Sequence, residues 1–278
     1  MSKKLITRRE FLRNSSVAAC AGAIYIGAPV KSLKADDSKT KVVLIREKDI
    51  LDNRWKPRAD LLENMLDRAV SKLLDVDDPV RAWQQLIKPD DIVGIKSNEW
   101  SRLATPPELE NAVRSRVLGC GVSEKNLSIG DRRILSDDVF LKASALINVR
   151  PMRTHDWSGV GSLIKNYIMF VNNPADYHGD SCADLATLWK LPLTEGKTRI
   201  NILVMLTPLF HGAGPHHYNP AYIWPYNGLI VGLDPVAVDA TGVRIIQAKR
   251  HEYFGEEKPI NPPPRHIFLA ETRHHLGV

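Results

Sequence analysis

Polar side chains stand directly after most of the strand-like segments in this sequence. Lys96 and Asn98 follow one such segment, and Asp131 follows the next. A basic run at 150–155 and the histidines within 211–217 stand after two later segments. The carboxyl ends of parallel strands meet at one edge of a sheet, where ligands of open α/β folds bind. We therefore expect these side chains to line one crevice.

The densest group of such residues lies at 148–166, which reads NVRPMRTHDWSGVGSLIKN. A strand ending in basic residues leads into a glycine-rich turn that opens a helix, and the N–H groups of a helix start face anions. The spacing matches neither a P-loop nor a dinucleotide fingerprint. The alternative is an ordinary helix start with solvated charges. Besides Lys96 and Asn98, the predicted anion-binding residues are Arg153, Thr154, Gly161, Lys165 and Asn166.

Histidines supply the candidate metal ligands. The run HGAGPHH places His211, His216 and His217 on a predicted loop, and imidazole binds zinc, copper, iron and nickel. His155 is expected to complete such a site or to act as a general base. Because the run fits no standard zinc spacing, ordinary surface histidines are the alternative. The suspected cofactor is a transition metal of unknown identity.

Carboxylates are the remaining candidates for acid–base chemistry. Asp131 forms the predicted catalytic set together with His155 and Lys165. Asp239 interrupts an otherwise apolar helix, where a carboxylate must be paired or face the site; a structural hydrogen bond is the alternative. Asp234 precedes a proline and suits a helix N-cap. The serine elbow GxSxG of many hydrolases does not occur in the sequence.

The elements that must position these residues follow from the spacing of apolar side chains. Residues 171–180 and 208–227 lack periodicity and are predicted loops, where sites often lie. The alternation of strands and helices predicts an α/β fold, with a mainly parallel sheet covered by helices on both faces. Strands are expected at 41–46, 91–95, 126–129, 145–149, 199–206 and 228–231, and helices at 57–74, 107–118, 161–170, 182–189 and 235–247, with a short C-terminal helix.

Residues 1–35 are predicted to be a twin-arginine signal peptide, and residues 36–278 one α/β domain. Paired arginines in TRREFLR precede an uncharged apolar run at 17–30, the order that such signals require. This run of ~14 residues falls short of the ~20 needed to span a bilayer. Cleavage is expected after Ala35, with lipidation at Cys20 as the alternative.

The twin-arginine translocase is the expected partner, and the mature chain is expected to be periplasmic or extracytoplasmic and not an integral membrane protein.

The charge of the chain excludes a nucleic-acid-binding protein, and its cysteine content excludes a protein with a cysteine-ligated iron–sulfur cluster. The formal charge of +6 comes from residues 1–35, which hold seven of the 38 Lys and Arg and one of the 32 Asp and Glu, leaving 31 of each. A neutral domain lacks the basic surface that DNA or RNA requires. Only Cys120 and Cys182 remain beyond residue 35. They allow one disulfide or two free thiols, but no cysteine-ligated iron–sulfur cluster.

Four segments together resemble the bacterial and archaeal domain of unknown function family 362 (DUF362), over about residues 40–275. They are IKSN, the pair GD at 130–131, INVRPMRTHDWSGVGSLIKN and GLDPVAVDATGVRII. In the third segment the family pattern resembles Pro-Lys-x-Lys-Thr-His, and here Met152 and Arg153 replace its lysines. Arginine cannot serve as an uncharged base. Some family members carry iron–sulfur domains, whereas this chain resembles the core domain alone.

Two functions remain open from the sequence. The first is an exported metal- or redox-cofactor-dependent protein, expected to be an enzyme acting on a small anionic substrate. The second is a non-catalytic periplasmic binding or accessory protein for an anionic small molecule or cofactor. A third possibility, a structural subunit, predicts a large apolar surface patch. All of them depend on the polar residues converging in space.

Overall fold

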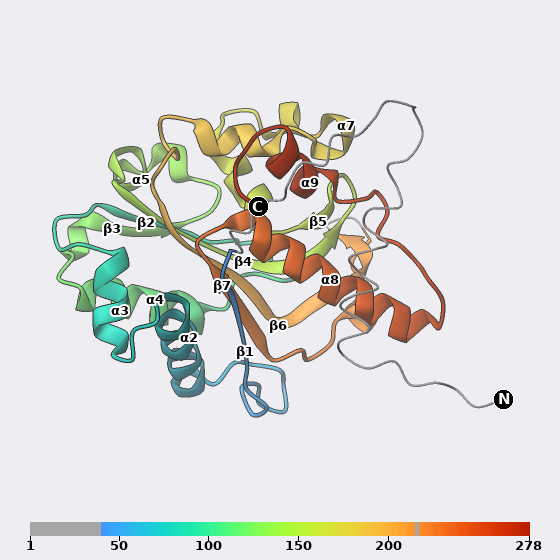
Figure 1. Cartoon of the computed structure of the whole chain (residues 1–278), viewed down its shortest axis with the longest axis horizontal. Helices are drawn as coiled ribbons and strands as arrows, with labels where there is room; N and C mark the ends of the chain where they lie inside the picture. The colour runs from blue at the N-terminus through green and yellow to red at the C-terminus, as the bar shows by residue number, and fades with distance from the viewer. Residues whose placement is uncertain (1–39, 215–216) are drawn as a thin grey trace, which may run out of the picture. The chain divides into compact units, whose positions relative to one another are not determined.

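A seven-stranded mixed sheet forms the centre of the molecule (Figure 1). The computed structural model describes residues 40–214 and 217–278, so the predicted signal peptide and His216 lie outside the described residues. The strand order is β1-β7-β6-β4-β2-β3, with β5 paired to β4. The strands are β1 (Val42–Arg46), β2 (Val93–Lys96), β3 (Leu127–Gly130), β4 (Ala145–His155), β5 (Gly159–Gly161), β6 (Thr198–Gly214) and β7 (Gly228–Gly232).

The central strands β3, β2, β4 and β6 pair in parallel, whereas β7, β1 and β5 each add an antiparallel pairing. Helices cover both faces, which confirms the predicted α/β class. The helices are α2 (Ala59–Leu74), α3 (Pro79–Leu86), α4 (Pro107–Gly119), α5 (Asp138–Lys142), α6 (Leu163–Asn166), α7 (Gly179–Cys182), α8 (Pro235–Phe254) and α9 (Arg265–Thr272). Shorter 3-10 turns are η2 (Glu124–Asn126), η3 (Ile134–Ser136), η4 (Tyr167–Phe170), η5 (Pro174–Tyr177), η6 (Leu185–Lys190) and η7 (Pro220–Tyr222).

Capping residues explain where the helices begin and end. The carboxylate of Asp78 accepts two backbone N–H groups at the start of α3, with Pro79 at its first position. Asp234 does the same for α8, as the sequence predicts. Helix α8 continues beyond the predicted residue 247 and ends at Gly255, whose φ of 72° lies in the left-handed region.

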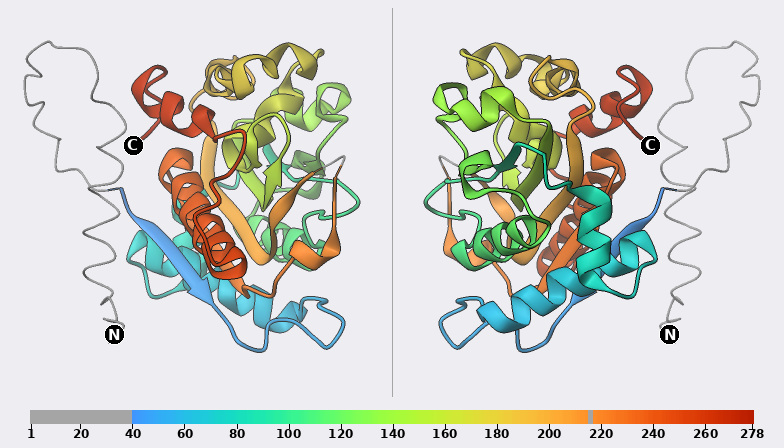
Figure 2. Two further views of the ribbon diagram at one scale, coloured as in Figure 1. Left: turned by 90° about the vertical axis from the view of Figure 1, so that its right-hand side faces the viewer. Right: turned by 90° about the vertical axis from the view of Figure 1, so that its left-hand side faces the viewer.

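Side-chain alternation divides the interior into two cores. Odd-numbered residues of β4, such as Ile147 and Val149, pack with α2, α3 and α4 on one face, whereas Leu146 and Met152 pack with α6, α8 and α9 on the other. Figure 2 shows these two layers on opposite sides of the sheet. The second face is the one that also carries polar side chains.

Two strands are longer than expected from the sequence. β4 extends to His155 and β6 to Gly214, and the two remain paired where Arg153 lies opposite Leu209. The prolines at 151 and 208 read as strand ends, but proline is tolerated at a bulge, and the register shifts between Pro151 and Arg153. The basic residues 150–155 and His211 therefore lie within strands, and not in the loops that the sequence predicts.

Within residues 40–214 and 217–278, no helix is long and apolar enough to cross a membrane. Both cysteines of this part of the chain are free thiols, and both are buried. Cys120 packs in the core beneath α4, and Cys182 packs in the opposite core. The sequence leaves a disulfide between them open, and the structure places them on different faces of the sheet.

Candidate functional site

A row of polar side chains crosses the face of the sheet beneath α6. Lys96 of β2 lies opposite Asn148 of β4, which lies opposite Asn201 of β6. All three are buried. Their neighbours Ile95, Ile147 and Ile200 point into the other core. The period of two along each strand therefore places all three polar groups on the same face.

The amide of Asn166 joins this row to α6. Its Nδ2 donates to Lys96 O at 3.0 Å, Asn148 Oδ1 at 2.8 Å and Val149 O at 3.2 Å. Its Oδ1 accepts from Lys96 Nζ and from Arg150 Nη1, each at 3.3 Å. Asn166 is fully buried. An amide with this many partners is held in one position, and it fixes the residues beside it.

Lys96 and Asp131 form a buried ion pair at the ends of β2 and β3. The Nζ atom of Lys96 lies 2.5 Å from Oδ1 of Asp131 and also donates to Ser97 O at 2.7 Å. Burial alone would raise the pKa of Asp131, but the charge of Lys96 and the N–H of Glu99 hold this pKa below its usual value. Burial lowers the pKa of Lys96 to about 8, against the opposing effect of Asp131. The carboxylate is therefore ionised at neutral pH.

The start of α6 is occupied by a carboxylate of the chain itself. Asp239 of α8 accepts the N–H groups of Leu163 and Ile164, both at 2.9 Å, and the hydroxyl of Ser162 at 2.7 Å. The sequence predicts that this helix start faces an external anion. The prediction places the external anion at the wrong position, because the carboxylate of Asp239 already accepts the hydrogen bonds of these N–H groups. Burial raises the pKa of Asp239 to about 6 despite these hydrogen bonds, which leaves it mostly ionised at pH 7.

Two buried arginines of β4 have no carboxylate in contact with them among the described residues. Arg150 is 4% exposed and donates only to Asn166, and Arg153 is 5% exposed and donates from Nη1 to Asn98 Oδ1 at 2.9 Å. The Nε atoms of both arginines have no hydrogen-bond partner in this part of the chain. The guanidinium of Arg153 also lies 4.3 Å from the centre of the Trp100 ring. Burial lowers the pKa of Arg150 to about 10 and lowers that of Arg153 strongly.

Three further groups lie near enough to these arginines for the charges to perturb one another. Burial, together with the charges of Arg150 and Arg153, lowers the pKa of Lys165 to about 8 against the opposing effect of Cys182. Burial and the charges of Lys165, Arg150 and Arg153 lower the pKa of His155 far below its usual range. Burial lowers the pKa of His266, on α9, to about 3. We call this group of five the cationic cluster, after its three cations Arg150, Arg153 and Lys165; the imidazoles of His155 and His266 are its two neutral members.

Gly161 is a tightly restricted position beside the cluster. A β-carbon added there would lie 3.0 Å from Nη2 of Arg150 and 3.4 Å from Cγ and Nε of Arg153. Glycine therefore lets the backbone of β5 approach the two guanidinium groups more closely than a residue with a β-carbon could without moving them. The sequence singles out Gly161 as part of a turn that binds an anion through its N–H groups. The structure gives it the different task of leaving space for arginine side chains.

A pocket of about 350 Å³ opens next to the cluster. His155 and His211 both line it, together with Thr154, Gly212, Arg250, Lys258, Pro259, Ile260 and Asn261. The hydroxyl of Thr154 donates to Gly212 O at 2.6 Å and thereby ties β4 to β6. Two of the sequence-predicted histidines thus meet at one pocket, and the cations Arg250 and Lys258 add to its positive charge.

Both pocket histidines have their Nδ1 atom engaged. Arg250 Nη1 lies 2.9 Å from Nδ1 of His211, and the N–H of Trp157 donates to Nδ1 of His155 at 3.2 Å. Because arginine only donates, His211 carries its proton on Nε2, and so does the neutral His155. The two imidazoles are therefore hydrogen-bond donors toward a ligand. Cations beside both rings also oppose the charge of a metal ion.

The remaining predicted site residues lie apart from the cluster. His217 is exposed. Asp234 caps α8 and also accepts the N–H of Val278 at 2.7 Å, so its role here is structural. No group of three His, Cys, Asp or Glu residues within the described ranges is arranged to hold a metal ion.

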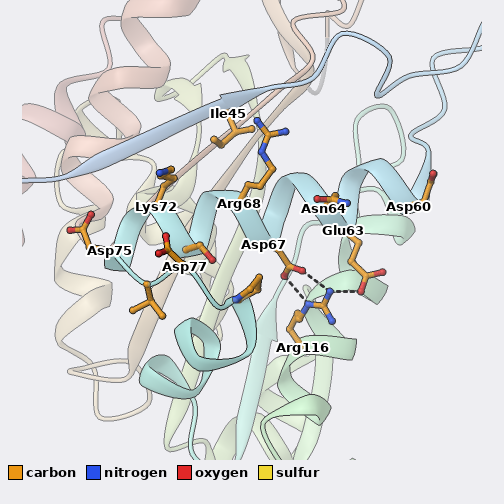
Figure 3. Close-up of a pocket in the computed structure, with 13 residues that line it drawn as sticks. Ile45, Asp60, Glu63, Asn64, Asp67, Arg68, Lys72, Asp75, Asp77 and Arg116 are labelled. Carbon is orange, nitrogen blue, oxygen red and sulfur yellow. Dashed lines mark hydrogen bonds and ion pairs between the residues drawn. The ribbon is translucent and has the colours of Figure 1, made fainter.

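A larger hollow of about 630 Å³ lies over α2, away from these residues. Its lining is dominated by charged side chains, and Figure 3 shows Arg116 reaching across it to Asp67 and Glu63. Both carboxylates lie 2.6 Å from the arginine. Arg116 is paired with these two carboxylates, and none of the charged residues that line the hollow is buried, so this hollow lacks the unpaired buried groups of the cluster.

His266 and Cys182 are site residues that sequence reasoning misses, and Arg150 is included there only as part of the basic run 150–155. Arg150 could have been found from the alternation within β4, since Asn148, Arg150 and Met152 share one face. His266 lies in a short helix after a proline-rich link, and no spacing in the sequence connects it to β4. Cys182 contacts Lys165, with Sγ 3.6 Å from Nζ, whereas the sequence predicts Cys182 only as the start of a helix at 182–189.

Comparison with known proteins gives one family. The model of the family described as "Domain of unknown function (DUF362)" matches residues 111–244. The matched range contains Asp131, Arg150, Arg153, Lys165 and Asp239, whereas Lys96 and His266 lie outside it. No curated protein and no solved structure matches the chain.

Proposed function

The chain belongs to the DUF362 family, and on that premise we propose that it binds a small anionic molecule at the cationic cluster. The observation that carries this proposal is the burial of Arg150, Arg153 and Lys165 without any contacting carboxylate in the described part of the chain. An unpaired charge held away from water costs several kcal/mol. A ligand that supplies oxygen acceptors would remove that cost, and it would accept from both free Nε atoms.

The burial of the cluster and the pocket beside it indicate how large the ligand is and where it enters. The cluster residues are nearly inaccessible, so the charged part of the ligand is compact, such as a carboxylate, sulfate or phosphate group. The adjoining pocket is of the size that small molecules occupy. It reaches the cluster at Thr154 and His155, and the Nε2–H groups of His155 and His211 offer two further donors.

Calorimetry with the full chain tests this function directly. Sulfate, phosphate, oxalate and pyruvate serve as probes, at fixed ionic strength because screening weakens charge interactions. We expect at least one probe to bind, and Arg153→Met to weaken that binding by tenfold or more, since a charged hydrogen bond contributes about 1.5–3 kcal/mol. Arg116→Met is the matched control, because that arginine lies over α2. Equal affinity of both variants, or no binding of any probe, would contradict the proposal.

Turnover of the bound anion is the second part of the proposal. One observation favours an enzyme: a lysine with its pKa near 8, Lys165, stands beside the two buried arginines. Such a group can transfer protons near neutral pH. The rival is a protein that binds the anion without changing it. Product analysis after incubation of wild type and Lys165→Met with a bound probe separates the two.

Export through the twin-arginine pathway is a separate proposal, supported by the motif at residues 7–13. Its test replaces Arg8 and Arg9 by lysine in an expressed full-length chain. We expect the wild type to be found in the periplasmic fraction and the double variant to stay in the cytoplasm. An identical distribution of both proteins would reject this route.

A further inference from the structure

Lys96 and Lys165 are both buried, yet their surroundings differ. The Nζ atom of Lys96 has three oxygen acceptors, which are Asp131 Oδ1, Ser97 O and Asn166 Oδ1. The Nζ atom of Lys165 has one hydrogen-bond partner in the described part of the chain, the thiol of Cys182 at 3.6 Å. A thiol sulfur is a weak acceptor. The folded chain therefore offers several oxygen acceptors to an ammonium group at Lys96 and only a weak acceptor to one at Lys165.

The charges around Lys165 act in the same direction. Burial lowers its pKa most, and the charges of Arg150 and Arg153 lower it as well. The thiol of Cys182 acts the other way, but burial raises the pKa of that thiol and keeps it protonated. A desolvated lysine next to other cations is a recognised form of amine nucleophile.

Hydrogen bonds on either side of Lys165 fix its position. The N–H of Ile164 donates to Asp239, and the amide of Asn166 is anchored to Lys96, Asn148 and Val149. Cys182, which contacts Lys165, ends a turn in which three successive residues have positive φ. These are Asp180, Ser181 and Cys182, with φ of 45°, 55° and 64°. Non-glycine residues in this region are strained, and such strain is concentrated at functional sites.

We propose that Lys165 forms an imine with the carbonyl carbon of a 2-oxo carboxylate. This inference rests on the proposed function, because Arg150 and Arg153 hold the carboxylate of the same ligand. In a 2-oxo acid the carboxylate is attached directly to the carbonyl carbon. Arg150 contacts Asn166, the next residue along the chain from Lys165, so a carboxylate held by the arginines would bring that carbon toward Nζ.

The reaction needs no other reactant. The lone pair of the neutral amine attacks the carbonyl carbon, and a proton moves from nitrogen to oxygen to give a carbinolamine. A carbon–nitrogen double bond then forms as the carbon–oxygen bond breaks. The oxygen leaves as water with both hydrogens of the amine, so the sum is amine plus ketone giving imine plus water.

Borohydride trapping tests the imine. The full chain is incubated with pyruvate, reduced with sodium borohydride and digested, and peptide mass spectrometry locates the adduct. A solvated lysine with a pKa near 10.4 has on the order of a hundredfold less free amine at neutral pH than a lysine near 8. We therefore expect the modified fraction at Lys165 to exceed that at the exposed Lys142 by about tenfold or more. Lys96 has a similarly lowered pKa, but its Nζ is held by Asp131, Ser97 O and Asn166, so it is the control for a buried lysine and should stay unmodified.

The variants and probes separate the two proposals. Lys165→Met should abolish the specific adduct, and Lys142→Met should leave it unchanged. Oxalate, an anion that forms no imine under these conditions, should compete with pyruvate. If pyruvate and oxalate bind in the calorimeter but no adduct forms at Lys165, the imine is rejected and anion binding stands. If neither binds and any adduct is spread over exposed lysines, both proposals fail.

Discussion

Lys96 Nζ lies 2.5 Å from Oδ1 of Asp131, across two neighbouring parallel strands. Of the four buried lysines and arginines on β2, β4 and α6, namely Lys96, Arg150, Arg153 and Lys165, Lys96 is the one with a carboxylate in contact among the described residues. Asp239, the other carboxylate nearby, is bound to the start of α6. Positive charge therefore exceeds negative charge in a region that water barely reaches.

Removing the charge of Lys165 should stabilise the free protein. The difference between its usual pKa of 10.5 and about 8 corresponds to about 3 kcal/mol at neutral pH, and a methionine keeps most of the packing. We expect Lys165→Met to raise the free energy of unfolding by about 1–3 kcal/mol in urea titrations at pH 7. Lys142→Met should change it by less than about 0.5 kcal/mol. A destabilised Lys165→Met would show that the ammonium is well accommodated.

The stabilisation from Lys165→Met should depend on pH in a defined direction. Between about pH 8 and 10.5 the unfolded chain keeps the proton of Lys165 and the folded chain has lost it, so the free energy of unfolding of the wild type rises with pH in this window. Below pH 8 both states are protonated and the contribution is constant. The advantage of Lys165→Met should therefore shrink toward zero by about pH 10.5. An advantage that stays constant from pH 7 to 10.5 would be inconsistent with a depressed pKa.

Asp239 should be important for stability, because it links α8 to the start of α6. Asn cannot accept from Leu163, Ile164 and Ser162 with the strength of a carboxylate, and its NH₂ group would face backbone donors. We expect Asp239→Asn to lower the free energy of unfolding by about 2–4 kcal/mol. Asp138→Asn, at an exposed position paired with Lys142, is the control and should cost less than about 0.5 kcal/mol. Equal effects would remove the structural role assigned to Asp239.

Gly161→Ala should weaken anion binding. The added methyl group would crowd Arg150 and Arg153 at 3.0–3.4 Å, and the guanidinium groups would have to move away from the ligand. We expect the dissociation constant of the best-bound probe to rise about tenfold, as measured by calorimetry, for a loss of about 1.4 kcal/mol. Gly119→Ala is the matched control, because a β-carbon there meets nothing within 4 Å. Unchanged binding by Gly161→Ala would mean that the arginines do not contact the ligand.

The transition metal suspected from the sequence can be tested by elemental analysis. His155 and His211 do line one pocket, but both have Nδ1 engaged and cations beside them. We therefore expect protein purified without chelators to hold first-row metals well below one equivalent, with no difference for His155→Ala. One equivalent of metal that His155→Ala loses would overturn this expectation and support the metal-dependent function.

The fold was largely predictable from the sequence because its signals are local. Apolar residues with periods of two and about 3.6 locate six of the seven strands and the long helices α2, α4 and α8. The cap at Asp234 is an interaction over two or three residues. Strand ends were less predictable, because proline in a paired strand reads as a terminus unless the partner strand is known. β5, with three residues, is too short for any periodicity.

The sequence by itself determined the alternating α/β architecture and the group of polar residues at the ends of its strands. Tertiary structure alone decided which of them remain unpaired. Asp239 binds the start of α6 from about 75 residues away along the chain, and His266 joins Arg150 from α9. The physical reason is that a buried polar group takes whichever partner the folded chain brings to it, and that partner is set by packing between distant segments. The excess of positive charge around Lys165 is therefore a property of the folded chain and not of any single motif.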